Sequence, residues 1–343
     1  MKYDNITIKD IAKALNLTAS TVSRALRDKY DISAETKNRV LAYAEKANYR
    51  PHPMALGLKE KKTRSIGIVV SEIANNYFSQ AINGIESIAN SRGYHIIIIQ
   101  THESSEREKN NVHNLVARGV DGLLISMSNE TKDTSYLQHL KNKGLPIVFF
   151  DRIPGEIETY KVIANNYLGA FQATEHLISQ GLKKIAHITS SPHLSITKER
   201  LSGYKDALNK HKIKYREELV KFCEYGGMRI EEIEDAISSL FALKTKPDAL
   251  FLAGDRISTQ SLQVLRKLGK MEKLKLVGFT NTSLSDLFLP SLTVVEQPAY
   301  EMGQVATEFL IQLIESKHPV SKFDTRVIDT KLIVRDSSTK QAI

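Results

Sequence analysis

The sequence holds a single cysteine, Cys223, among its 343 residues. One cysteine excludes an intramolecular disulfide and any cysteine-rich zinc module, and it is typical of a protein from a reducing cytoplasm. Long apolar runs are also missing, because the strings HIIIIQ and PIVFFD are far shorter than the ~18 residues of a membrane span. The N-terminal MKYDNITIKD lacks the apolar core of a signal peptide. We therefore expect a cytoplasmic protein without contact to the membrane.

The motifs of common enzyme chemistry are absent as well. No GxGxxG follows a strand, and neither a GxxxxGK[ST] phosphate loop nor a GxSxG nucleophile elbow occurs. The ten histidines are scattered without an HExxH pair, so residues such as His176 and His187 are expected to be packed or solvated rather than metal ligands. We predict no enzymatic activity, no cofactor and no metal site.

Length and charge indicate how the chain is organised. A chain of 343 residues is too long for one small core and predicts two or three domains. Residues 1–64 hold 14 Lys and Arg against 7 Asp and Glu, so they carry +7 of the net charge of +9. A basic end on a nearly neutral body is the electrostatic footprint of a phosphate-binding module.

Residues 6–26 carry the pattern of two short helices. Apolar residues recur at i, i+3, i+4 and i+7, the stripe of an amphipathic helix, at Ile8, Ile11, Ala12 and Leu15. A break follows at residues 16–17, and Thr18, a favourable N-cap, begins a second helix that ends near Leu26. Two short helices joined by a tight turn predict a helix-turn-helix, whose second helix lies in the DNA major groove.

A third helix and a proline-containing segment come next. Ser33 can cap a helix that runs to about Asn48. Its apolar residues, which can close a small three-helix core, are Val40, Leu41, Ala44 and Ala47. Pro51 and Pro53 end this helix. The following residues 54–59 are too few for a stable isolated helix, so the segment is either a flexible linker or a hinge that folds against DNA or a partner chain.

From Ser65 onward, strand-like and helix-like segments alternate. Near-continuous apolar strings, SIGIVV, HIIIIQ, GLLIS, PIVFFD, KKIAHITS, DALFLAG and LKLVGFT, are separated by amphipathic stretches. This alternation predicts doubly wound parallel sheets. Because the pattern restarts near residue 165, we expect two such lobes, with ligand groups at the carboxyl ends of the strands facing a cleft.

The chain resembles the lactose/galactose repressor (LacI/GalR) family of bacterial transcription regulators over nearly its whole length. The matching segments include TIKDIAKALNLTASTVSRAL, VLAYAEKANYRPHPMALGLK, GVDGLLI, PIVFFDR, ANNYLGAFQATEHLISQG, PDALFLAGDRIS and PSLTVVEQPAYEMG. So many ordered matches are specific for the family but not for any one effector. The resemblance implies a homodimer bound to a roughly palindromic DNA operator and joined by its body lobes.

The resemblance also implies which residues contact DNA. Base readers correspond to Ala19, Ser20 and Arg24, and Ser20 and Arg24 share one helix face. Arginine is the commonest bidentate reader of guanine. Residues expected at the phosphates, with helix capping as the alternative, are Thr7, Thr18, Thr21 and Ser23. Leu58 matches a hinge leucine inserted into the minor groove, flanked by Ala55 and Lys59; packing against the body is its alternative.

For the effector, the resemblance implies a set of aromatic, acidic, amide and arginine side chains. The set is Tyr77, Phe78, Asp151, Arg152, Asn165, Asn166, Arg200, Asp255, Arg256 and Asn281. Such groups suit a polyhydroxylated ligand, and the arginines leave a sugar acid or a sugar phosphate open. Many relatives have two acids where Thr280 and Asn281 stand, which makes a cationic ligand unfavourable here. Capping is the alternative for Asp151 and Asp255, and core packing for Phe78.

We therefore expect a helix-turn-helix domain at residues 1–50, a hinge helix or linker at 51–63 and a two-lobed effector domain resembling periplasmic binding proteins at 64–338. Its first lobe is expected at about 64–163 and 296–324, and its second at about 164–293 and 325–338. The expected function is a sugar-responsive transcription regulator that represses carbohydrate-utilisation genes and associates with the nucleoid when bound to DNA. The alternative is a sugar-binding protein without a DNA-directed role.

Overall fold

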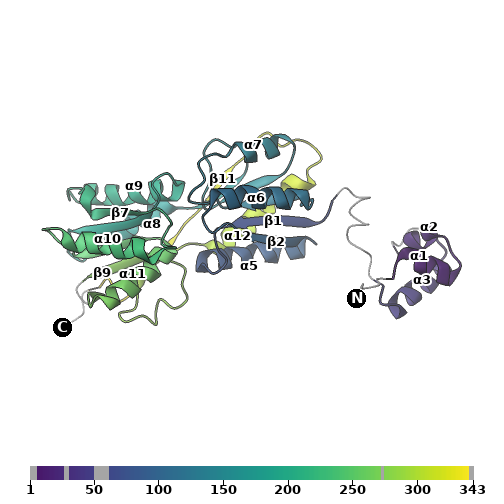
Figure 1. Cartoon of the computed structure of the whole chain (residues 1–343), viewed down its shortest axis with the longest axis horizontal. Coiled ribbons are helices and arrows are strands. Elements are labelled where there is room, and N and C mark those ends of the chain that lie inside the picture. Colours follow the sequence, from purple (N-terminus) through teal and green to yellow (C-terminus); the bar gives the residue numbers. More distant parts are fainter. Residues whose placement is uncertain (1–5, 27–30, 50–61, 272–273, 340–343) are drawn as a thin grey trace. The chain divides into compact units, whose positions relative to one another are not determined.

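The computed structural model describes residues 6–26, 31–49, 62–271 and 274–339, which divide into two compact units between Thr63 and Arg64 (Figure 1). The predicted hinge residues Ala55, Leu58 and Lys59 lie outside the described residues. Each unit is taken by itself below.

The first unit holds three helices in its described part, α1 (Ile8–Leu15), α2 (Ala19–Ala25) and α3 (Ala34–Lys46). Each begins at a hydroxyl side chain that accepts a hydrogen bond from a backbone N–H in the first turn, the caps being Thr7, Thr18 and Ser33. The turn between α1 and α2 passes through Asn16, which ends α1 in the left-handed conformation with φ of 52°.

The three helices bury a small apolar core. Its fully buried or nearly buried members are Ile11, Ala12, Val22, Ala25, Val40 and Ala44. Leu41, which we predicted to belong to this core, is instead 41% exposed. It follows Val40 directly on α3, and a residue one step along a helix is turned by about 100° away from its neighbour's face.

The second unit contains two six-stranded sheets. The strands of the first are β1 (Ser65–Val70), β2 (His95–Gln100), β3 (Gly122–Ile125), β4 (Ile147–Phe150), β5 (Lys161–Ala164) and β11 (Thr325–Ile328). Those of the second are β6 (Ile185–Ser190), β7 (Val220–Cys223), β8 (Ala249–Ala253), β9 (Lys275–Phe279), β10 (Thr293–Glu296) and β12 (Lys331–Ile333). The strand orders are β11-β5-β4-β3-β1-β2 and β12-β10-β9-β8-β6-β7.

Helices cover both faces of each sheet (Figure 1). The first sheet carries α5 (Asn76–Ser91) and α12 (Ala299–Glu315) on one face and α6 (Ser105–Ala117) and α7 (Ser135–Asn142) on the other. The second carries α8 (Asn166–Ser179) and α9 (Ser195–Lys210) on one face and α10 (Ile230–Ala242) and α11 (Asp255–Lys267) on the other. A short 3₁₀ helix, η1 (Glu217–Leu219), precedes β7. We call these two layered bodies the first and second lobes.

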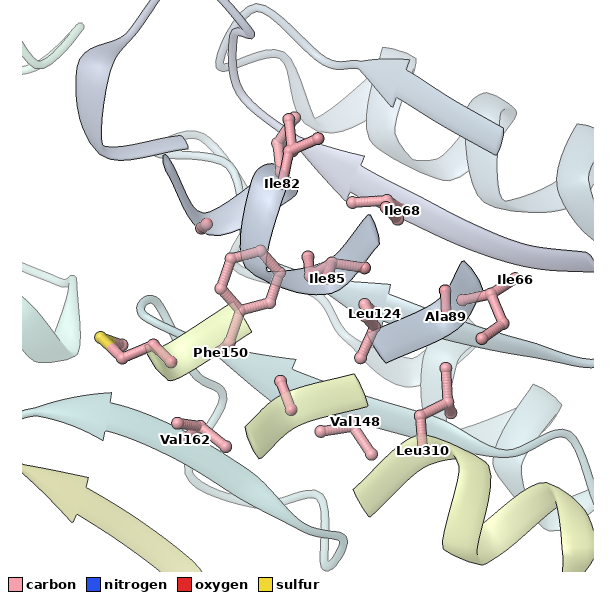
Figure 2. Packing of buried hydrophobic residues seen from close by; sticks show 14 of the residues in the cluster. Ile66, Ile68, Ile82, Ile85, Ala89, Leu124, Val148, Phe150, Val162 and Leu310 are labelled. Carbon is pink, nitrogen blue, oxygen red and sulfur yellow. The ribbon is translucent and has the colours of Figure 1, made fainter. Parts of the chain in front are cut away.

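The strands are apolar on both sides because both of their faces are covered. Along β1, Ile66 and Ile68 point to the α5 and α12 face, whereas Val69 points to the α6 and α7 face. Figure 2 shows the first of these layers, in which Ile66, Ile68, Ile85 and Leu310 interlock. The predicted architecture, a helix-turn-helix followed by two doubly wound lobes, is confirmed.

Two strands depart from the predicted arrangement. Residues 325–328 were expected in the second lobe, but β11 pairs in parallel with β5 at the edge of the first sheet. Among the strands of the described residues, β12 alone runs in the opposite direction, since it pairs antiparallel with β10. Both strands are short, and β11 is mostly exposed whereas β12 is only partly buried, so their hydrophobicity alone does not specify a sheet. Within the described residues, no helix is long and apolar enough to cross a membrane.

The contact between α5 and α12 requires two glycines. A Cβ atom on Gly84 would lie 2.0 Å from the Tyr300 carbonyl oxygen, and one on Gly303 would lie 2.1 Å from the Ala81 carbonyl oxygen. Backbone atoms of a packed helix cannot move aside without shifting the whole helix. The two glycines therefore fix how closely these helices approach.

We expect Gly84→Ala to lower the free energy of unfolding by about 1–3 kcal/mol, the usual cost of overpacking, despite the better helix propensity of alanine. Urea unfolding followed by circular dichroism would measure the loss. Gly155→Ala is the matched control, because nothing lies within 4 Å of a Cβ at Gly155. Equal stability of the two variants would contradict the close crossing.

Candidate DNA-reading and effector sites

The exposed side of α2 presents the predicted base-reading residues. Ala19, Ser20 and Arg24 are exposed, whereas Val22 and Ala25 on the opposite side are buried. The Arg24 guanidinium donates to Ser20 Oγ at 3.0 Å and to Asp31 Oδ2 at 2.7 Å. Ser20 and Arg24 thus form a connected pair on one face of the helix.

The threonines predicted at the phosphates have structural partners of their own. Thr7 and Asp10 form a capping box at the start of α1, and the hydrogen bond from Thr7 lowers the pKa of the Asp10 carboxyl. Thr18 caps α2, and its hydroxyl lies 2.8 Å from the Thr21 hydroxyl. Ser23 is partly buried on α2. The capping alternative thus holds for Thr7 and Thr18, and their exposed position leaves them accessible to phosphate.

In the second unit, the predicted effector residues lie mainly where strands end and helices begin. Tyr77 and Phe78 lie in the first turn of α5, Asp151 and Arg152 follow β4, and Asn281 follows β9. The remaining residues are on the first turns of α8 and α11 and on α9: Asn166, Asp255, Arg256 and Arg200. The carboxyl ends of parallel strands share one edge of a sheet, so these segments from both lobes converge.

Asp151 and Arg200 form the centre of this convergence. Asp151 is 4% exposed, and its backbone is left-handed with φ of 60°, a conformation that is costly for a residue with a side chain and clusters at functional sites. Burial raises the pKa of the Asp151 carboxyl, and the neighbouring Arg152 and Arg200 oppose that rise. Tyr77 adjoins it, since burial and then the charge of Asp151 raise the pKa of its phenol.

The Arg200 guanidinium makes two hydrogen bonds and stacks on an aromatic ring. Its Nε donates to Asn166 Oδ1 at 2.9 Å, its NH1 group donates to the Ala253 carbonyl at 3.1 Å, and its Cζ lies 3.8 Å from the centre of the Phe279 ring. Asn166 in turn donates to Glu199 Oε2 at 2.9 Å. Burial lowers the pKa of Arg200 to about 10, and Asp151 and Glu199 counteract this effect.

Three other predicted residues make contacts between the lobes. Arg256 Nε donates to Glu72 Oε2 at 2.7 Å, and the amide of Asn281 donates to Gln80 Oε1 at 2.8 Å. Asp255 accepts a hydrogen bond from the Thr280 hydroxyl and one from the Asn281 N–H, and its Oδ2 atom lies 3.4 Å from the backbone nitrogen of Asn76. Asp255, Arg256 and Asn281 therefore tie the two lobes together.

Two predicted residues serve structural roles. Asn165 caps α8 by accepting from the Leu168 N–H, and its amide donates to Asp329 Oδ1 at 2.9 Å, so its side chain is not part of the central cluster. Phe78 belongs to the first-lobe core, where its ring meets Phe150 edge-on at 6.4 Å. Its ring centre is also 6.0 Å from the Arg152 Cζ.

A cavity of about 460 Å³ opens beside this cluster and is lined by both lobes. The first lobe contributes Met127, Lys132 and Arg152, and the second contributes His193 and Ser195. Arg152 is 9% exposed, and its Nε atom has no hydrogen-bond partner among the described residues. A buried donor without a partner costs free energy, and a polar ligand could satisfy it.

Sequence reasoning missed several members of the site. Glu103 contacts Arg152, Glu72 contacts Arg256, Glu199 contacts Asn166, and Phe279 stacks on Arg200. A signal was present, because Glu72, Glu103 and Phe279 lie at or just after the carboxyl ends of strands. Within the described part of the chain, no three His, Cys, Asp or Glu side chains are placed to hold a metal ion.

His187 lies beneath the cluster in the second-lobe core. Its ring stacks on Tyr204 at 5.0 Å and lies 4.8 Å from the Phe251 ring. Burial, together with the nearby positive charge of Arg200, lowers the pKa of His187 from 6.5 to about 3. The prediction that this histidine is packed rather than metal-bound agrees with its surroundings.

We expect the protein to lose stability as the pH falls below 6.5, because the unfolded chain then protonates His187 and the folded chain does not. At pH 5 this difference amounts to about 2 kcal/mol, at about 1.4 kcal/mol per pH unit. Urea unfolding at pH 7 and pH 5 would measure the loss in the wild type and in His187→Leu, which should lose about 2 kcal/mol less. His318→Leu, at an exposed histidine, should behave like the wild type; an unchanged pH dependence in His187→Leu would contradict the assignment.

The chain combines a helix-turn-helix unit that has an exposed Ser–Arg face with two doubly wound lobes that meet at a polar cluster. This combination is typical of ligand-responsive transcription regulators. Known proteins bear this out. The sequence profile of bacterial regulatory proteins of the lacI family matches residues 7–52, and that of the periplasmic binding protein-like domain matches residues 174–338. The chain belongs to the LacI family of bacterial transcription regulators.

Individual relatives extend over almost the whole chain. A ribose operon repressor from Halalkalibacterium halodurans is 31% identical over 336 residues, which is 97% of each chain. Among solved structures, a complex of the regulator CelR with cellobiose has a TM-score of 0.71 and 26% identity over 97% of this chain and 100% of that one. A lac repressor dimer bound to operator and an anti-inducer has a TM-score of 0.82 at 22% identity, covering 98% and 100%. The relatives are named as regulators, in agreement with the prediction of a non-enzymatic protein.

Proposed function

We propose that this chain is a homodimeric repressor that binds a palindromic operator and is switched by a small polar effector between its lobes. One observation carries the switch: Asp255, Arg256 and Asn281, which we predicted to contact the effector, join the two lobes. A ligand that competes for these side chains must change how the lobes are held. Coupling between two sites of this kind amounts to ~1–3 kcal/mol.

For DNA, we propose Ser20 and Arg24 as base contacts, with Ala19 beside them and Thr7, Thr18, Thr21 and Ser23 at the phosphates. The exposure of Ala19, Ser20 and Arg24 on α2 and the basic excess of residues 1–64 support this assignment. We also propose that Leu58, flanked by Ala55 and Lys59, enters the minor groove at the operator centre. This last proposal rests on the family resemblance.

For the effector, we propose a carbohydrate and hence a role in carbohydrate utilisation. Asp151, Asn166 and Arg200 supply the acidic, amide and guanidinium groups that bind sugar hydroxyls, and Tyr77 adjoins them. Two relatives support this proposal by name, since one is a ribose operon repressor and another was solved with cellobiose. We expect the protein to act in the cytoplasm and at the nucleoid when bound to DNA.

For the dimer, apolar surface supports contact through both lobes. Leu287 is 71% and Leu289 is 91% exposed beside a second-lobe cavity of about 550 Å³. In the first lobe, the edge strand β2 carries isoleucines at positions 96–99 that are only partly buried. Exposed apolar patches and free strand edges are favoured association surfaces. A sedimentation mass equal to one chain at micromolar concentration would contradict the dimer.

The test of the function is a gel-shift assay of the full chain with fragments of its own genome at about 50 and 200 mM salt. We expect a small set of fragments to be retained, with affinity that falls steeply with salt as phosphate contacts are screened, and release or tightening when a sugar is added. Binding of sugars without any sequence preference for DNA would favour the alternative, a sugar-binding protein without a DNA-directed role.

A further inference from the structure

We propose that the effector carries no negative charge and that Glu103 is the residue that sets this selectivity. The inference rests on the proposed function of the inter-lobe site, and it narrows the three ligand classes named above, sugar, sugar acid and sugar phosphate, to the uncharged sugar. It follows from how the three arginines of the site are already engaged by other groups of the protein.

Arg152 is the arginine that lines the inter-lobe cavity, and Glu103 already neutralises it. The Arg152 NH1 group donates to both carboxylate oxygens of Glu103, at 2.7 and 2.9 Å. The side chains are 11% and 5% exposed, so this pair is shielded from water. Burial would lower the pKa of Arg152, but the charges of Glu103 and Asp151 outweigh it and raise that pKa.

Glu103 is held firmly in place. Its Oε2 atom accepts the backbone N–H of Asn129 at 2.8 Å. The backbones of Glu103 and His102 are both left-handed, with φ of 66° and 51°. Residues that carry a side chain rarely adopt this conformation, and it persists where the surrounding structure imposes it. An anionic ligand would have to displace a carboxylate that the fold positions against Arg152.

The other two arginines are also engaged, Arg256 by an ion pair and Arg200 by hydrogen bonds to Asn166 and the Ala253 carbonyl. Arg256 binds Glu72 across the lobes, and Arg200 lies between the negative charges of Asp151 and Glu199. The positive groups left at the cavity are Lys132 and Lys198, which are exposed at its rim together with Glu156. Charges in water are screened and contribute little to selectivity.

An uncharged sugar fits this arrangement better than an anion. A hydroxyl both donates and accepts hydrogen bonds, so it can bind the Arg152 Nε atom and an acidic oxygen at once without disturbing the ion pairs. A carboxylate or phosphate only accepts and adds negative charge beside Asp151, Glu103 and Glu199, where the low dielectric makes like charges repel strongly.

The experiment uses the full chain and matched ligands: neutral aldoses, the corresponding uronates and the aldose phosphates. Thermal shift identifies a binder by mass action, and isothermal titration then gives the affinity of each member of its set. We expect the neutral sugar to bind at least ~100-fold more tightly than its uronate and phosphate. A uronate or phosphate that binds as tightly as its neutral counterpart overturns the inference and leaves the proposed switch intact.

Glu103→Gln tests the role of the residue. Removing the negative charge of Glu103 leaves the positive charge of Arg152 unneutralised. The preference for the neutral sugar over the uronate should therefore fall at least tenfold or reverse. Glu156→Gln is the matched control, because Glu156 borders the same cavity but is exposed and accepts from Thr134 rather than from Arg152; its preference should stay unchanged. An unchanged preference in Glu103→Gln overturns the assignment of Glu103.

Two further outcomes are also decisive. If Glu103→Gln fails to fold, Glu103→Asp, which keeps the charge, should retain the wild-type preference, and a lost preference there contradicts the inference. If none of these ligands binds while sequence-specific DNA binding persists, the proposed carbohydrate effector fails, and the inference fails with it.

Discussion

An Arg24→Ala variant should bind the operator between ~30-fold and ~10⁴-fold more weakly than the wild type. Loss of one base-reading arginine costs about 1–3 kcal/mol, and a dimer on a palindromic operator loses two, about 2–6 kcal/mol in all. The structure supports a specific role, because Ser20 Oγ and Asp31 hold the guanidinium on the exposed face of α2. Titration of a labelled operator fragment at fixed salt would measure the loss.

The control is Arg39→Ala, which removes an equal charge from an exposed position on α3. It should weaken binding to all sequences modestly and reduce the salt dependence, whereas Arg24→Ala should also relax the preference for the operator over unrelated DNA. Asp31→Asn releases one partner of Arg24, an exposed pair worth at most about 1 kcal/mol, so it should tighten binding a few-fold. If Arg24→Ala weakens operator and unrelated DNA equally, Arg24 contacts only the DNA backbone.

Arg200→Leu should lower the free energy of unfolding by about 3–5 kcal/mol, the cost of removing one partner of a buried charge pair. Arg200 is 3% exposed, and its loss removes one of the two arginines that counteract the burial of Asp151 and an arginine that counteracts the burial of Glu199. Urea unfolding would measure this loss, and the operator titration with and without sugar should show that the response to the effector is gone.

The pH dependence of the stability deficit distinguishes loss of charge from loss of packing in Arg200→Leu. Burial already raises the pKa of Asp151 in the folded wild type, and without Arg200 it should rise further. The folded variant then holds a proton that the unfolded chain releases, so the deficit relative to the wild type should shrink as the pH falls from 8 to 5. Arg200→Lys retains the charge but not the planar fork, and should lose less stability. A deficit independent of pH would mean that packing against Phe279, not charge, is what the variant removes.

Local chemistry determined much of this protein in advance. An apolar stripe located α1, and the hydroxyl residues Thr18 and Ser33 located the starts of α2 and α3, because an N-cap and its first turn are contiguous in sequence. The alternation of apolar strings with amphipathic stretches located the strands and helices of both lobes, since strands buried on both faces are apolar throughout. The resemblance to a known family brought Asp151, Arg200 and Asp255 into consideration together.

Tertiary structure alone decided which of these groups meet. The sequence contains Glu103 and Arg152 49 positions apart and Glu72 and Arg256 184 positions apart, and no local pattern specifies such pairs. The same holds for β11, whose few exposed residues could pair with either sheet, and for Asn165, which caps a helix although its neighbour Asn166 binds Arg200. Helix caps and strand hydrophobicity depend on near neighbours, whereas charge pairing and strand order depend on which distant segments the folded chain brings into contact.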